Sequence, residues 1–494
     1  MAGQFSQNES PHKEDQPGDD CSATQVMTVS TIVDFDGPAD PLSPRNWPKR
    51  KKAIHTLLYG LTTMGSTFSS AIYSTSIQQV AQELHVGPDV SSLGTSMLLM
   101  GFGLGPLVWA PASEIYGRKV PMLLPYFLTA CFTFGTATAK DIQTVLLTRF
   151  FAGLFGSAPI SITGGVLTDM FEPDQRGVAL VFYAIAVVGG PVFGPVVGGA
   201  LVQTQGSMGW RWTQYVTGIY MATIFALDVL LLDESYAPAL LVAKAKQMRH
   251  QTRQWAWHAR HEERDPTIKE MTKKFMLRPL QLLGTPIGFL FSLHSSFVYS
   301  IVYLNLGAFP IVFQEIRGWS PFIGSLPFLA LLVGIAFGAA INFKSQAYYR
   351  TCMAANKGVA VPEARLPPMM IGSVMLAGGL FVMANTADPR FHWIAPVTAA
   401  AMMGVGFFTI FQAALNYMID TFHLYGASAV AANTFTRSML ASLFPSLVPK
   451  IYGRMGIQWA TNMLAFVAFV MIPIPWLFFY FGKRIRARGT WSRH

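Results

Sequence analysis

The 494-residue chain has the composition of a membrane protein. Hydrophobic residues make up 51% and charged residues 13%, about half of the ~25% that a soluble globular domain carries. The net charge of +10 does not indicate a nucleic-acid binder, because Lys and Arg lie in short segments between long apolar runs instead of on one solvated face. The three cysteines have neither metal-ligand nor redox spacing, so no disulfide framework is expected.

Residues 1–44 are predicted to form a disordered cytoplasmic tail, because this segment is polar, mostly acidic and lacks the apolar core of a signal peptide. Twelve apolar runs follow, each of roughly 20 residues or more, the length needed to cross about 30 Å of hydrocarbon. They lie near residues 53–78, 92–113, 121–139, 143–168, 178–203, 212–232, 284–312, 322–343, 368–385, 392–418, 427–449 and 457–481.

The longest hydrophilic interruption divides these runs into six and six. The predicted organisation is an N-terminal half at 45–232, a cytoplasmic linker at 233–282, a C-terminal half at 283–482 and a basic cytoplasmic tail at 483–494. Charged residues between Glu262 and Lys274 predict a surface helix in the linker. The fold class is therefore an all-α integral membrane protein with twelve transmembrane helices in two six-helix halves, typical of transporters with a substrate site between the halves.

Lys and Arg predict the orientation of these spans. Most loop cations lie in one alternating set of connections, which includes both termini and the linker. Because basic loops remain on the cytoplasmic side, both termini of this multi-pass protein are expected there. The plasma membrane is the expected location, and the vacuolar membrane is the alternative.

The loop between spans two and three carries an acid, a glycine and two bases. Gly117 permits a tight turn, and Glu114 is expected to pair with Arg118 or with the N-terminal dipole of a facing helix. Together with Lys119, this cluster is predicted to latch one conformation of a transporter and to release another. Ordinary positive-inside loop charge is the alternative.

Arg149 lies near the external end of span four, where a charge costs several kcal/mol unless it faces a cavity or snorkels to the interface. Helical spacing places Gly153 and Gly156 on the same face, which predicts a close helix contact. Since an arginine does not titrate at useful pH, its predicted role is to tune a nearby carboxylate or water, with snorkelling as the alternative.

Span five contains the run from Gly190 to Gly199, which holds two prolines. Such a segment would break a helix in water, whereas in a membrane neighbouring helices support it and its missing side chains admit another backbone. The prolines are expected to bend the span, and Gly194 and Gly198 to allow tight packing. A tight crossing without functional consequence is the alternative.

These motifs resemble those of the major facilitator superfamily. The span-five run resembles the antiporter motif of its proton-coupled exporters at Gly190, Gly194, Pro195, Gly198 and Gly199. The cytoplasmic loop resembles Gly-x-Leu-Ala-Asp-Arg-x-Gly-Arg-Lys, with Glu114 in place of the usual Asp and Ala110 in place of the first Gly. That variant resembles the fungal twelve-span drug:proton antiporters, in the branch of polyamine and multidrug exporters. Arg149 followed by Gly153 resembles the fourth-span motif, to which a role in proton transfer is ascribed.

In this fold, spans one, four, seven and ten line the substrate cavity and span five lies beside it. The predicted lining combines aromatic rings with amides and hydroxyls, which suit a bulky, partly apolar ligand. Its members are Ser69, Ser70, Tyr73, Tyr183, Tyr299, Tyr303, Asn305, Phe411, Gln412, Asn416 and Tyr417. Ordinary helix packing is the alternative for each single residue.

Acidic residues are scarce in the spans. Asp169, Asp228 and Asp420 fall near predicted cytoplasmic ends, where we expect caps or loop partners, so the proton carrier stays unassigned. The lack of a mid-cavity acid disfavours a dedicated carrier of polyamines or other cations. His294 is expected to be a satisfied packing histidine, and Arg437 to pair structurally with a carboxylate or a backbone carbonyl.

The resemblance implies a secondary transporter that exports hydrophobic or amphipathic small organic molecules, such as drugs, toxins or secondary metabolites, by proton antiport with alternating access. The expected partners are the substrate, protons and the lipid bilayer; no cofactor, metal or nucleic acid is expected, and the protein is expected to be a monomer. A proton-coupled or facilitative importer of a sugar or vitamin is one alternative, and a non-transporting membrane sensor is another. No hydrolase or nucleotide-binding motif favours an enzyme.

Overall fold

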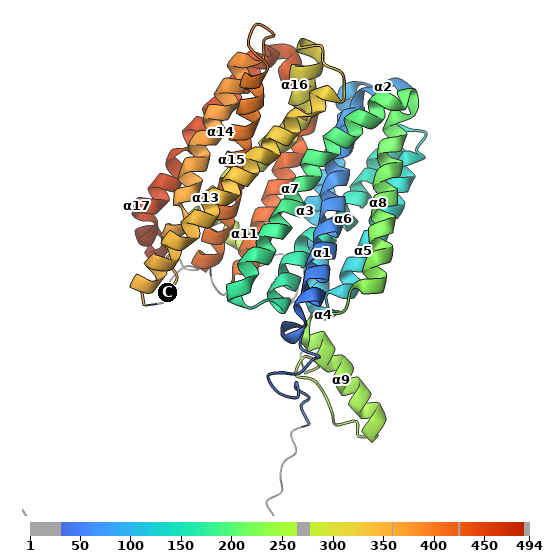
Figure 1. The fold of residues 1–494 in the computed structure, drawn as a ribbon, viewed down its shortest axis with the longest axis vertical. Helices are drawn as coiled ribbons and strands as arrows, with labels where there is room; N and C mark the ends of the chain where they lie inside the picture. Colours follow the sequence, from blue (N-terminus) through green and yellow to red (C-terminus); the bar gives the residue numbers. More distant parts are fainter. Residues whose placement is uncertain (1–30, 264–276, 358, 423–424, 489–494) are drawn as a thin grey trace, which may run out of the picture.

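The computed structural model describes residues 31–263, 277–357, 359–422 and 425–488. Within these residues the structure is a bundle of long helices, and extended pairing is confined to one isolated bridge between Ile32 and His258. The helices of the N-terminal part, blue to green, gather on one side of the bundle, and those of the C-terminal part, yellow to red, gather on the other (Figure 1). The predicted all-helical architecture is confirmed.

The N-terminal part consists of long apolar helices joined by short turns. Its helices are α1 (Lys49–Ile72), α2 (Ile77–Glu83), α3 (Pro88–Leu104), α4 (Pro106–Ile115), α5 (Lys119–Ala137), α6 (Ile142–Met170), α7 (Pro173–Thr204) and α8 (Gly209–Leu231), with 3₁₀ turns η1 (Pro44–Asn46), η2 (Tyr73–Ser76) and η3 (Gly206–Met208). Local chemistry fixes the helix starts: Asp141 caps α6 by accepting a hydrogen bond from the Thr144 amide at 2.7 Å.

The C-terminal part repeats this pattern. Its elements are α11 (Arg278–Leu283), α12 (Pro286–Phe309), the π-helical η5 (Pro310–Ile316), η6 (Ile323–Ser325), α13 (Pro327–Ala355), η7 (Pro362–Arg365), α14 (Pro367–Thr386), α15 (Ile394–Phe422), α16 (Gly426–Met471) and α17 (Pro473–Arg488). Gly456 interrupts α16 with a φ of +74°, a conformation that glycine adopts without steric cost. Two spans therefore meet at Gly456 within this single element.

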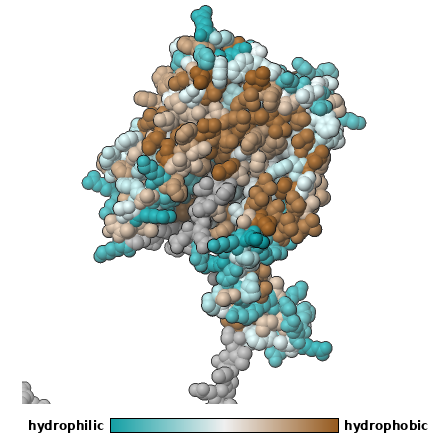
Figure 2. Space-filling view, in the orientation of Figure 1, coloured by the Kyte–Doolittle hydropathy of each residue, from teal (hydrophilic) through white to brown (hydrophobic). Residues whose placement is uncertain are grey.

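Ten segments of the described chain are long and apolar enough to cross a membrane. The last of these, Ser428–Ala487, contains the Gly456 break and so holds two of the predicted spans. α1 is not among the ten, because its first turn is basic and its interior is rich in Ser and Thr. Apolar side chains cover the flank of the bundle and hydrophilic ones gather at its two ends, as a lipid-embedded protein requires (Figure 2).

The N-terminal segment packs on the region predicted as the linker. Helix α9 (Ala237–Thr252) projects from one end of the bundle (Figure 1). The Val33 amide donates to the His258 carbonyl at 2.9 Å, and Lys244 forms an ion pair with Asp36 at 2.7 Å. The surface helix expected between Glu262 and Lys274 starts in a turn, and its remainder lies outside the described residues.

Candidate functional site

A chain of buried hydroxyl groups connects the two parts of the bundle. The hydroxyl oxygens of Ser70 on α1 and Tyr303 on α12 are 2.8 Å apart. The Tyr299 hydroxyl, one turn along α12, donates to Tyr303 at 3.3 Å. All three side chains are buried. These residues, predicted separately as cavity lining, form one contact between the N-terminal and C-terminal parts.

Arg149 lies at the N-terminal end of this group with 1% of its surface exposed. Its Nη1 donates to the Ser69 carbonyl at 2.9 Å and its Nε to the Gly94 carbonyl at 3.2 Å. Its guanidinium group lies 4.6 Å from the ring centroid of Tyr73, a cation–π contact. Arg149 therefore faces the protein interior and does not snorkel. Among the described residues its contacts include no carboxylate, so the predicted tuning of an acid has no partner there, and the predicted tuning of a water stays a prediction.

Glycines bring α6 directly against α3. A Cβ atom on Gly153 would lie 2.1 Å from the Leu98 carbonyl oxygen, and one on Gly101 would lie 2.4 Å from the Leu154 amide nitrogen. Neither distance is possible for real side chains, so both positions require glycine. The predicted close helix contact below Arg149 is confirmed, and it brings Arg149 within reach of the α3 backbone.

Arg437 is the second buried guanidinium of this region. It projects from α16 with 6% of its surface exposed and lies 4.4 Å from the ring centroid of Tyr299 and 4.9 Å from that of Phe411. Within the described part of the chain it forms no hydrogen bond or ion pair, and its Nε is fully buried without an acceptor. The predicted pairing with a carboxylate or carbonyl is therefore wrong for that part of the chain.

Further aromatic rings extend this group. Phe407 stacks on Phe411 at a centroid distance of 6.0 Å and lies 6.4 Å from Tyr299. Tyr183 of α7 donates its hydroxyl to the Ile160 carbonyl at 2.8 Å and lies within electrostatic range of Arg437 and Tyr299. The central group thus combines two arginines with Ser, Tyr and Phe side chains from both parts of the bundle.

Two predicted lining residues lie in the C-terminal core instead. Tyr417 stacks on Phe291 at 4.4 Å and also packs against Phe478 of α17. Asn305 is buried and its side-chain amide donates to the Met403 sulfur at 3.7 Å. Their helical positions matched the cavity face, but packing among α12, α15 and α17 takes them into the core. Two others, Gln412 and Asn416, are half-buried on α15.

The glycine run of α7 packs against the backbone of α1. A Cβ atom on Gly190 would lie 2.5 Å from the Phe68 amide nitrogen of α1, and one on Gly198 would lie 3.0 Å from the Ile72 carbonyl oxygen of α1 and 2.3 Å from Thr75 Oγ1 of η2. A Cβ atom on Gly194 would lie 2.9 Å from the Ile72 amide nitrogen of α1, so three positions of the motif serve the same helix crossing. The predicted tight packing of span five is confirmed.

Gly199, the last residue of the run, contacts the other part of the bundle. A Cβ atom there would lie 2.6 Å from the Pro321 carbonyl oxygen. Nearby, the Phe322 amide donates to the Gln203 side-chain oxygen at 3.1 Å. The end of α7 is thus in direct contact with the residues just before η6, so the two parts meet at the end of the bundle away from α9.

At the opposite end, the Gly117 turn is held by one acid from the segment between α8 and α9 and by one from α6. Gly117 has a φ of +86°, and the Glu234 carboxylate accepts from the amides of Arg118 at 2.8 Å and Lys119 at 3.0 Å. The Arg118 side chain pairs with Asp169 of α6 at 3.0 Å. Glu114 is half-buried at the end of α4. The turn and the structural role of Asp169 are confirmed, whereas the anchoring by Glu234 was not predicted, because more than 100 residues separate the partners.

The C-terminal part contains a matching ion pair. Arg365, just before α14, pairs with Asp420 near the end of α15 at 3.0 Å, and Tyr349 donates its hydroxyl to the same carboxylate at 2.9 Å. Arg118 and Asp169 occupy the equivalent places before α5 and near the end of α6. The structural role expected for Asp420 is confirmed, and the pairs support two related halves.

Comparison with known proteins now decides the family. Residues 59–445 match the Major Facilitator Superfamily. The chain belongs to this family. It is 48% identical over 463 residues to the efflux pump bik6 of Gibberella fujikuroi, covering 94% of this chain and 95% of that protein. It is 36% identical over 464 residues to the multidrug transporter FLU1 of Candida albicans, covering 93% of this chain and 76% of that protein.

A solved structure supports the same fold. The xylose transporter XylE of E. coli, in a partially occluded inward-open conformation, aligns with a TM-score of 0.61 over 88% of this chain and 98% of that one. At 14% sequence identity this likeness concerns the fold alone. The predicted twelve-span facilitator fold is confirmed.

In this facilitator, Asp228 of α8 is a buried acid without a cation beside it. None of its surface is exposed, Thr62 of α1 donates to its Oδ2 at 2.7 Å, and its Oδ1 has no partner among the described residues. The expectation of a hydrated cap or loop partner is wrong, because the α1–α8 contact covers the side chain. His294 on α12 is also buried, with an unpartnered Nδ1 in the described structure, so it is packed but not satisfied.

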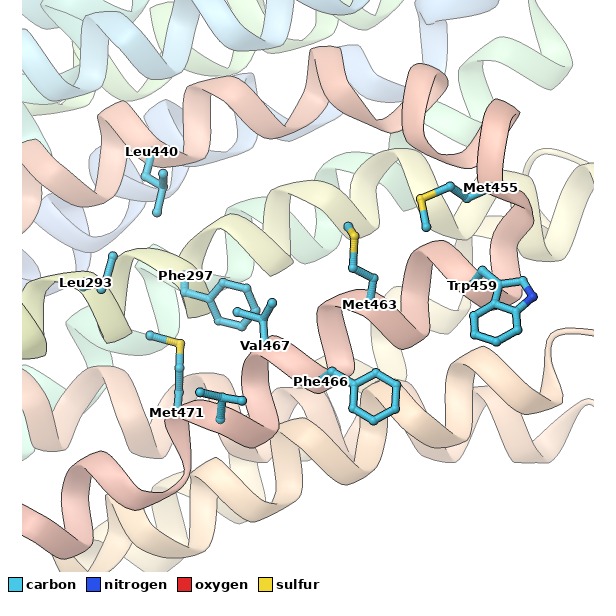
Figure 3. Close-up of a pocket in the computed structure, with 10 residues that line it drawn as sticks. Leu293, Phe297, Leu440, Met455, Trp459, Met463, Phe466, Val467 and Met471 are labelled. Atoms are coloured by element: carbon cyan, nitrogen blue, oxygen red, sulfur yellow. The ribbon is translucent and has the colours of Figure 1, made fainter.

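A separate apolar groove of about 640 Å³ lies between α12 and α16 (Figure 3). Its lining includes Phe297, Met463 and Val467 but none of the predicted cavity residues. Met455, Trp459 and Phe466, also in the lining, are exposed on the apolar flank of the facilitator. Lipid chains suit this surface, and the central polar group lies elsewhere.

Proposed function

We propose that this facilitator exports hydrophobic or amphipathic small organic compounds in exchange for protons. The observation that carries the proposal is the polar and aromatic group shared by the two halves, in which Ser70 meets Tyr303 and Arg437 lies against Tyr299. A site that is built by both halves is assembled and opened by their relative rotation, which is the basis of alternating access. Two relatives, an efflux pump and a multidrug transporter, support the outward direction.

The packing of α7 supports alternation between two states. Its glycines fix α7 on α1, and Gly199 brings the end of α7 against Pro321 of the other half. Opening the bundle at this end requires separation of Gly199 from Pro321 and of Gln203 from Phe322, without loss of the α1–α7 crossing. The described structure therefore corresponds to a state closed at the end away from α9.

We assign the proton to Asp228. A buried carboxylate with no cation beside it costs several kcal/mol, and binding a proton removes that cost. Asp228 contacts Thr62, eight residues before Ser70 on α1, so movement of α1 relative to α8 changes its environment. A carboxylate covered in one state and hydrated in the other couples proton uptake to the conformational change.

The remaining features follow from this mechanism. The proposed transporter acts as a monomer in the plasma membrane, uses the proton gradient instead of a cofactor and performs no catalysis. The N-terminal segment, α9 and the end of α17 lie at one end of the bundle, together with most basic loops, which supports cytoplasmic termini (Figure 1).

Reconstitution in liposomes tests the proposal. The protein would be given a pH gradient, and movement of the neutral lipophilic dye Nile red would be followed for wild type, Asp228→Asn and the control Asp388→Asn. Asp388 is an exposed residue at the opposite end of the bundle. We expect gradient-driven accumulation in wild type and control, and only downhill movement in Asp228→Asn. Dye movement in wild type that does not depend on the pH gradient would instead support passive, facilitated diffusion. Dye uptake in the same direction as the proton flow would support a proton-coupled importer.

A further inference from the structure

We propose that the central site selects aromatic compounds that carry an acidic group, with Arg437 binding the anion. This inference rests on the proposed export function and names its substrate class. Arg437 lies near the middle of the first span of α16 and is 94% buried, yet it has no hydrogen-bond acceptor or counter-ion among the described residues. A guanidinium group with five donors in a fixed fork is completed by a planar carboxylate or a comparable anion.

The helices packed against α16 supply no acid to Arg437. Among their described residues, α3 has Asp89 in its first turn, α4 has Glu114 in its last turn, and α15 has Asp420, which is bound to Arg365 and Tyr349. None of these carboxylates forms an ion pair with Arg437 in the described structure. Helices α12 and α14 contain neither Asp nor Glu. The missing negative charge therefore has to come from outside the packed helices, and a transported anion would supply it.

The charge around the site favours the same sign of ligand. Arg149, buried on the N-terminal side, also has an unpartnered Nη2 among the described residues. The hydroxyl chain of Ser70, Tyr303 and Tyr299 lies between the two arginines. The buried acid nearest along α1 is Asp228, whose partner Thr62 is eight residues before Ser70, about 12 Å along the helix. Two cations in a region of low dielectric attract anions and repel cations.

The rings beside Arg437 define the rest of the ligand. Tyr299 and Phe411 lie within 5 Å of the guanidinium, and Phe407 continues the stack from Phe411 with nearly parallel planes, 12° apart. Flat aromatic molecules gain offset stacking on such a surface. An acid attached to an aromatic ring system can therefore place its charge on Arg437 and its rings on α15 and α12.

A binding comparison tests the inference on the purified full chain in detergent. The probes are 1-pyrenebutyric acid, which is ionised at pH 7.5, and its neutral methyl ester, followed by pyrene fluorescence. We expect wild type to bind the acid at least tenfold more tightly than the ester. Arg437→Gln should remove this preference and leave ester binding unchanged, and Arg437→Lys should retain part of it. The control Arg390→Gln, at a fully solvated loop position, should behave as wild type.

The results separate this inference from the export proposal. Equal binding of acid and ester by wild type would overturn the inference, without need of any variant, and so would an equal loss of both ligands in a folded Arg437→Gln protein. Nile red, which carries no charge, reports on export independently in liposomes. Gradient-driven export of Nile red without a binding preference for the acid would support the export function and contradict the anion site. A preference for the acid without any gradient-driven transport would support the anion site and contradict the export function.

Discussion

Ser70 and Tyr303 place their hydroxyl oxygens 2.8 Å apart across the interface between the two halves. Both belong to helices that must separate on one side of the membrane when the transporter changes state. Tyr303 also accepts a hydrogen bond from the Tyr299 hydroxyl, and the Tyr299 ring contacts Arg437, so the chain of contacts continues from Ser70 to Arg437. This pair therefore reports directly on whether the halves are together at the level of the substrate site.

Replacement of the bridging hydroxyl tests that relationship. Tyr303→Phe removes two buried hydrogen bonds, the one from Tyr299 within α12 and the one with Ser70. Only the bond with Ser70 joins the halves, and its loss, worth about 1 kcal/mol, shifts the balance between closed and open states about fivefold toward open. Hydrogen–deuterium exchange should rise at the contact of α7 with η6, around Gly199 and Pro321. Tyr480→Phe, at an exposed position of α17, is the control. Unchanged exchange in Tyr303→Phe would show that the bond does not hold the halves together.

The sequence predicted well those features that depend on local pattern. Apolar length gave the spans, and the spacing of Gly190, Gly194 and Gly198 on one face gave the tight α1–α7 crossing. Interactions between distant segments were missed. Asp228 looked like a surface cap by its place near a helix end, but its burial depends on Thr62 of another helix.

Arg437 illustrates the same limit. Its position in an apolar span indicated burial, and the usual expectation for a buried cation is a counter-ion. Its surroundings are set by α12 and α15, more than 20 residues away in the chain, and they supply aromatic rings instead. The residue pattern within α16 contains no information about these aromatic neighbours, because they belong to other helices.

The α1–α7 crossing predicts opposite effects for two glycine substitutions. Gly190→Ala places a methyl group 2.1 Å from Thr67 Oγ1 and 2.5 Å from the Phe68 amide, which should cost about 1–3 kcal/mol of stability. Gly164→Ala is the matched control, because no atom lies within 4 Å of its Cβ position, and it should be neutral or stabilise by up to about 1 kcal/mol. Thermal unfolding in detergent measures both. Similar melting temperatures for the two variants would contradict the crossing.

Gly199→Ala should separate function from stability. Its new methyl group meets the Pro321 carbonyl oxygen of the other half, whereas the α1–α7 crossing stays intact. We expect a melting temperature close to that of wild type, with driven transport reduced about tenfold, because the end away from α9 no longer closes fully. Transport assays and thermal unfolding on the same preparation decide this. A loss of stability equal to that of Gly190→Ala would place Gly199 in the crossing instead.

Glu83, at the C-terminal end of α2, predicts a pH dependence of the stability of the fold. Burial raises the pKa of Glu83, but hydrogen bonds from Trp210 and Arg211 outweigh it and hold the pKa below its ordinary value of 4.5. A lowered folded-state pKa stabilises the fold above the unfolded value, and this contribution is lost as the pH falls through the folded pKa. Because Glu83 is about one-third exposed, we expect only about 0.5 kcal/mol. Glu83→Gln should thus melt below wild type at pH 7, and the difference should shrink below pH 4.5 and vanish once the pH is below the folded-state pKa. A difference that persists in acid would exclude the ion pair as its cause.

The two matching ion pairs predict equivalent coupling energies in the two halves. Arg118–Asp169 and Arg365–Asp420 have the same 3.0 Å contact, and all four side chains are mostly buried. Double-mutant cycles with Arg→Gln and Asp→Asn should give about 1–2 kcal/mol for each pair in the free energy of unfolding. If the pairs also latch the end of the bundle near α9, both Arg→Gln variants should change the transport rate in the same direction. A coupling energy near zero for one pair, with the other intact, would show that the halves share this geometry without sharing its energetic role.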